Sequence, residues 1–193
     1  MIEIILRNLA TTYYPKGICA LYSKKEYIET FEFKNLITKI NSTFATIVEN
    51  NFNGRILDEL KKNEELKNIK DLTLESSDRC LSFKVDFFEG QVLYQLCVNL
   101  SIIVPYYYVY VLKNKFEAEP YRWLTLPQRD EAVEIGKFGS QIALISDTIE
   151  KKFFFNKFPD SLVNTIIPDI NYADVELGSF TYFNAFFLDD VNL

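Results

Sequence analysis

Acidic and aromatic side chains near the end of this chain are the residues whose types and positions could bind a partner. All 21 lysines and arginines precede Phe158, whereas six of the 27 acidic residues follow it, so the net charge of −6 belongs to residues 158–193. An acidic surface attracts basic partners over a distance and repels phosphate backbones and anionic membranes. The segment therefore predicts a surface for a basic protein, and no binding of nucleic acid or membrane. The alternative is that these acids only solvate turns and helix starts.

We predict that the acidic surface includes nearby tyrosines. Tyrosine supplies rigid contact area that often anchors an interface, and acids steer a charged partner towards it. The predicted partner-binding residues are Asp169, Tyr172, Asp174, Glu176, Tyr182, Asp189 and Asp190.

Few residue types remain for catalysis, because the sequence contains no histidine. This excludes Ser-His and Cys-His mechanisms and histidine-ligated zinc. The three cysteines form no C-x-x-C pair, and the common nucleotide-binding and hydrolase motifs are absent. Adjacent carboxylates such as Asp189 and Asp190 could serve a glycosidase or a magnesium site, but such pairs are common in solvated turns. We predict no enzyme activity, catalytic residue, metal or cofactor. An enzyme based on carboxylates, tyrosine or cysteine is the alternative.

A run of tyrosines over residues 106–110 has two interpretations. The rings could pack beneath helices, or they could form a protein interface. A stacking platform for nucleic acid bases would need a basic groove, which this region lacks. The sequence leaves core and interface open.

Apolar residues at spacings of three and four predict helices before residue 70. The stretch Ser23–Glu26 has the S-x-x-E form of a capping box and predicts a helix start. We expect helices over 23–49 and 54–67, with a break near Thr30 or Asn41.

The apolar period changes to two after Asp71, which predicts strands. Expected strands cover 81–88, 92–103 and 106–111. Their connections are short, and parallel neighbours would need a long crossover, so the strands form an antiparallel meander. A helix is expected over 138–153 and a short one after Pro159. The aromatic tail over 178–188 fits a strand or a helix.

This order of elements predicts one α+β domain over residues 1–193. An antiparallel β-meander of three or four strands packs against helices from both the N- and C-terminal segments, and the helices cover one face of the sheet. The first residues lack a basic leader and a cleavage site, so we expect no signal peptide. The longest apolar run is too short to span a bilayer. Together with the odd number of cysteines, these features predict a cytoplasmic protein.

Several short stretches resemble immunity proteins of bacterial polymorphic toxin systems. They are Tyr13–Gly17, Glu26-Tyr27, the Thr30-x-Glu32 pattern, Asp78–Cys80 and the ending Leu177–Phe187. The resemblance implies a cytosolic, non-enzymatic protein that binds and blocks one cognate toxin, often a nuclease. A nuclease presents cations to phosphate, and an acidic inhibitor can occupy that site as a polyanion mimic. The alternative is an interaction or scaffold module of bacterial or phage origin without a toxin partner.

Overall fold

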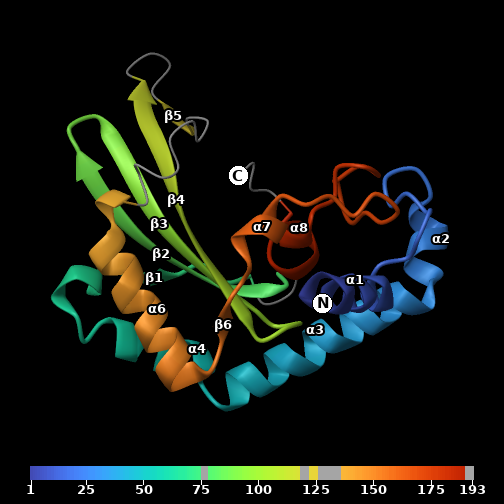
Figure 1. The fold of residues 1–193 in the computed structure, drawn as a ribbon, viewed down its shortest axis with the longest axis horizontal. Helices are drawn as coiled ribbons and strands as arrows, with labels where there is room; N and C mark the ends of the chain where they lie inside the picture. The colour runs from blue at the N-terminus through green and yellow to red at the C-terminus, as the bar shows by residue number, and fades with distance from the viewer. Residues whose placement is uncertain (75–77, 118–121, 126–135, 190–193) are drawn as a thin grey trace.

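The computed structural model describes residues 1–74, 78–117, 122–125 and 136–189. Helices surround a central, mostly antiparallel sheet (Figure 1), and this confirms the predicted α+β class. The helices are α1 (Ile2–Tyr13), α2 (Lys24–Glu29), α3 (Phe31–Glu49), α4 (Phe52–Leu60), α6 (Gly139–Phe153), α7 (Asp160–Val163) and α8 (Tyr182–Phe186). The strands are β1 (Lys70–Asp71), β2 (Cys80–Glu89), β3 (Val92–Ser101), β4 (Tyr106–Glu117), β5 (Arg122–Thr125) and β6 (Asn156–Lys157).

The three long strands are the predicted meander. β2 pairs with β3 in register from Cys80↔Ser101 to Glu89↔Val92, and β3 pairs with β4. Gly90 turns the chain between β2 and β3 with a φ of 59°, a conformation that glycine adopts without strain. The short strands β1 and β5 extend the meander at its two edges. β6 adds a parallel pairing to the start of β4.

Helices cover both faces of β4, whereas the sequence predicted one covered face. Adjacent strand residues point to opposite faces of a sheet. The Tyr107 hydroxyl donates to Glu150 of α6 at 2.6 Å on one face. On the other face the rings of Tyr108 and Tyr110 each meet Phe183 of α8, with centroids 5.9 Å apart. Because Tyr107, Tyr108 and Tyr110 are buried, the tyrosine run belongs mainly to the core.

The predicted helix break lies at Thr30, whose hydroxyl caps α3 by accepting from the Phe33 amide at 3.3 Å. Two local predictions are wrong. Ser23 makes no side-chain capping hydrogen bond, so the S-x-x-E motif is not a capping box here. The helix expected over 54–67 ends at Leu60, and a single 3-10 turn at Glu64–Leu66 follows it.

The aromatic tail forms a helix, α8, which settles the open choice between helix and strand. A capping box does start this helix, because Thr181 and Asn184 satisfy each other's backbone amides. All five residues of α8 are buried, so its apolar residues show no one-sided pattern. In the described ranges no helix is both long and apolar enough to cross a membrane.

Candidate binding site

The acidic C-terminal segment runs back across the N-terminal helices after α7 and reaches the side of α2 (Figure 1). There it makes a tight turn, in which the Val175 amide donates to the Tyr172 carbonyl at 3.1 Å. Ala173 has a φ of 48°, which L residues with a Cβ rarely adopt. This turn places Asp174 at its exposed tip.

A cavity of about 400 Å³ lies between this turn and the α2–α3 corner. Most of its lining is aliphatic or aromatic, with one acid and one lysine. The lining residues are Ala20, Leu21, Lys24, Tyr27, Ile28, Phe33, Tyr172, Ala173 and Asp174. We call it the α2 pocket. Its volume falls within the range of ligand pockets, which is about 300–1,000 Å³.

Three rings form the aromatic wall of the α2 pocket. Tyr27 meets Phe33 edge to face at 5.6 Å between centroids, and Phe33 lies stacked beside Tyr172 at 6.5 Å. The Tyr27 hydroxyl donates to the Asn171 carbonyl at 2.6 Å, so it is already satisfied within the protein. The wall therefore offers aromatic surface, and burial raises the pKa of Tyr27, which keeps its phenol neutral.

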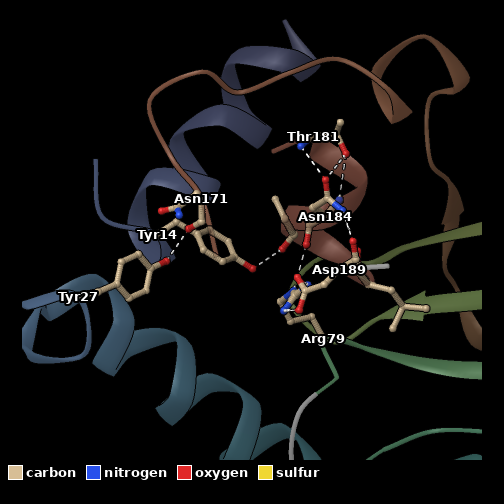
Figure 2. Close-up of polar contacts among 9 residues, drawn as sticks. Tyr14, Tyr27, Arg79, Asn171, Thr181, Asn184 and Asp189 are labelled. Atoms are coloured by element: carbon tan, nitrogen blue, oxygen red, sulfur yellow. Dashed lines mark hydrogen bonds and ion pairs between the residues drawn. The ribbon is translucent and has the colours of Figure 1, made fainter. Parts of the chain in front are cut away.

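Arg79, Asn184 and Asp189 form a group of polar contacts that we call the Arg79 cluster (Figure 2). Arg79 is 1% exposed, and its guanidinium lies 4.5 Å from the Tyr172 ring centroid. Its two terminal nitrogens donate to the two oxygens of Asp189 at 2.5 and 3.4 Å, and its Nε donates to the Asn184 carbonyl at 3.1 Å. This bidentate pair joins the start of β2 to the end of the chain.

Asn184 fixes the chain around that ion pair. Its amide nitrogen donates to the carbonyls of Leu188 and Asp189 at 3.1 and 3.0 Å, while its oxygen accepts from Thr181. Burial opposes the charge on Arg79, yet Tyr14 and the Asp189 carboxylate raise the pKa of Arg79 above its ordinary value. The guanidinium therefore stays charged and paired.

The structure divides the seven residues that the sequence analysis named. Tyr172 and Asp174 line the α2 pocket, and Glu176 is exposed two residues further along. Asp169 and Asp189 are paired with other residues of this chain, and Tyr182 is buried. Asp169 pairs with Arg7 at 3.3 Å and Lys16 at 3.9 Å, Tyr182 is 2% exposed, and Asp189 pairs with Arg79. Asp190 lies outside the described residues.

Charged side chains in the stretches that flank the α2 pocket lack such partners among the described residues. The flanking stretches 20–33 and 172–177 hold two lysines and five acids. None of these seven side chains makes an ion pair with any residue that the structure describes. Leu21 and Ile28 line the pocket and remain 39% and 43% exposed. The pocket therefore combines exposed apolar surface with flanking stretches that hold three more acids than lysines.

Sequence reasoning missed the N-terminal half of the pocket. A usable signal was present, because Lys24, Tyr27 and Ile28 recur at spacings of three and four and so share one face of α2. The positions across the pocket, Tyr172 and Asp174, are more than 140 residues away in the chain. No local pattern reports that pairing.

Two other cavities and the buried cysteines are weaker candidates for a functional site. A groove of about 300 Å³ beside the β3–β4 connection is mainly apolar, and a cavity of about 440 Å³ between α4 and α6 holds Glu59 paired with Lys62 and Lys152. Cys80 and Cys97 are buried, and burial raises the pKa of each to about 12. Among the described residues no three His, Cys, Asp or Glu side chains are grouped to hold a metal ion.

Comparison with protein-family models, curated proteins and solved structures finds no match to this chain. Its function must therefore be argued from the α2 pocket and the charges around it.

Proposed function

We propose that this protein binds a basic protein partner in a stoichiometric complex. The proposed interface is the α2 pocket together with the exposed acids Asp174 and Glu176, which we call its acidic rim. The observation that carries the proposal is the difference between acids of one segment. Asp169 and Asp189 pair with Arg7 and Arg79, whereas Asp174, which lines the open aromatic pocket, and the nearby Glu176 make no ion pair with any described residue. Aromatic anchors with a charged rim are typical of protein interfaces.

The resemblance to immunity proteins suggests the kind of partner. We propose a cognate bacterial toxin, such as a basic nuclease domain, which the protein neutralises in the cytoplasm without chemistry of its own. The acidic rim would cover cations that the toxin presents to phosphate. A scaffold module that binds a structural partner is the alternative, and exposed apolar residues such as Leu21 and Ile28 would serve it equally well.

Calorimetric titration against the C-terminal domain of the protein encoded immediately upstream of this gene, the proposed toxin, tests the proposal. We expect a one-to-one complex whose affinity falls as salt rises, because screening weakens attraction between exposed charges. The variant Asp174→Asn/Glu176→Gln should bind about tenfold more weakly, equivalent to about 1.4 kcal/mol.

The matched control is Asp58→Asn/Glu65→Gln, which removes two exposed acids from α4 and the 3-10 turn that follows it. It changes the net charge equally and should leave the affinity within about twofold. If both variants weakened partner binding equally, the affinity would depend on the net charge of the protein and not on the positions of Asp174 and Glu176. A structural partner that binds the same surface, with no protection of cells from the toxin, would favour the scaffold alternative.

A further inference from the structure

We infer that the α2 pocket receives an arginine side chain from the partner. This inference rests on the proposed function and names the group that the pocket recognises. An arginine has an aliphatic stem and a flat, weakly hydrated charged head. The α2 pocket offers a surface for each part of this side chain, because its lining contains aliphatic residues for the stem and an aromatic wall and one carboxylate for the head.

The aliphatic stem fits the α2 side of the pocket. Leu21 and Ile28 project from this side and remain partly exposed, so they have apolar surface left to cover. An arginine stem would bury that surface without placing the charged head in an apolar environment. A short acidic side chain could not cover it in the same way.

The aromatic wall fits the guanidinium. Guanidinium groups stack on tyrosine and phenylalanine rings, and this protein already makes such a contact, since Arg79 lies over Tyr172. The Arg79 charge does not repel a second cation strongly, because Asp189 pairs with it at both oxygens. Tyr27 and Phe33 supply further ring surface in the pocket lining.

Asp174 gives the pocket its preference for a cation. Its carboxylate lies on the exposed turn and makes no ion pair with any described residue. Such a carboxylate can accept two parallel hydrogen bonds from one guanidinium. Lys24 lines the same pocket and opposes a cation, but the flanking stretches 20–33 and 172–177 together hold five acids against two lysines. An anionic occupant would instead depend on Lys24.

Small probes test this inference without the partner. The ¹⁵N-labelled protein is titrated with N-acetyl-arginine amide and, in parallel, with N-acetyl-citrulline amide, a neutral side chain of the same shape. We expect saturable shifts of backbone amides in 20–33 and 172–175 with the arginine probe, at a dissociation constant on the order of 10 mM. The citrulline probe should bind at least about fivefold more weakly, because it lacks the charge that Asp174 recognises.

Two variants sharpen the result. Asp174→Asn should remove the preference for arginine over citrulline, and Lys24→Ala should strengthen arginine binding by about two- to threefold by removing a like charge. Asp58→Asn is the control and should change neither. The inference would be overturned by equal binding of both probes, by shifts confined to other regions, or by no binding. Preference for an N-acetyl-glutamate amide that Lys24→Ala abolishes would also overturn it. The proposed function fails separately, if the partner titration shows no complex.

Discussion

The Arg79 cluster and the α2 pocket both contact Tyr172, and both use acids from the same C-terminal segment. In the cluster, Asp189 meets a buried cation and its neighbours are fixed by Asn184. In the pocket, Asp174 meets no described cation and faces open, mostly apolar surface. The first acid therefore contributes to folding, and the second is available to a partner. What separates their roles is the side chain placed opposite each acid.

The largest effect that would test this contrast is on stability. Arg79→Met should lower the free energy of unfolding by about 3 kcal/mol, because Asp189 loses its partner and the buried Asn184 carbonyl loses a donor. Arg7→Met is the control, since Arg7 pairs with Asp169 on the surface, and should cost less than about 1 kcal/mol. Urea unfolding measures both. Similar costs for the two variants would remove the distinction between a folding pair and a surface pair.

Neutralising Asp174 and Glu176 should weaken partner binding and leave the stability of the fold almost unchanged, in contrast to Arg79→Met. We expect Asp174→Asn/Glu176→Gln to change the free energy of unfolding by less than about 0.5 kcal/mol, as is usual for exposed positions without specific contacts. The same variant is the one expected to weaken partner binding about tenfold. Urea unfolding beside the titration separates the two effects. A clear loss of stability would mean that these acids also hold the fold together.

The turn that presents Asp174 offers a smaller test. Ala173→Gly removes the steric cost of the left-handed conformation and should raise the free energy of unfolding by up to about 1 kcal/mol. The gain is offset in part because glycine gives the unfolded chain more freedom. Urea unfolding checks this change, with Ala45→Gly in α3 as an opposite control that should destabilise by about 1 kcal/mol. If both variants destabilise equally, the turn is not strained.

The smallest expected effect concerns Glu59, a partly exposed acid that is paired with two lysines. Hydrogen bonds from Lys152 and Lys62 lower the pKa of Glu59 to about 2 from an ordinary 4.5. A lowered folded-state pKa adds stability above the unfolded-state pKa, and this stability is lost as pH falls from about 4.5 through about 2. Glu59→Gln should therefore show a shallower loss of stability across this window. Unfolding at several pH values measures it, and an identical slope in both proteins would contradict the cause given for the shift.

The period of apolar residues predicted much of the fold. It indicated the meander of β2, β3 and β4 and the helix α6. Of the two positions predicted for a helix break, Thr30 and Asn41, the break lies at Thr30. The tail could not be assigned by period, since α8 is buried on every side. The capping box of α8 uses Asn184 in place of the usual Glu or Gln, so the sequence pattern did not reveal it. The usual S-x-x-E pattern at Ser23, in contrast, forms no capping hydrogen bond from the Ser23 side chain. One capping motif was therefore predicted where none forms, and another was not recognised where one does form.

The site was only half predictable. Tyr172 and Asp174 could be named because the charge of the chain gathers in their segment. The role of Asp189 could not, because its partner Arg79 lies 110 residues away. Tyr27 and Phe33 were missed for the same reason, since only the folded chain brings α2 and α3 to the turn at Ala173.

Hydrogen exchange of the protein, alone and with the proposed partner domain encoded upstream of its gene, tests the central claim most directly. We expect binding to slow exchange of amides in 20–33 and 172–177, which form the α2 pocket and its rim. Amides in α8 and at the start of β2, around the Arg79 cluster, should exchange slowly in both states because they already lie in the core. Protection confined to another surface, such as the groove beside the β3–β4 connection, would contradict the assignment of the α2 pocket as the binding site.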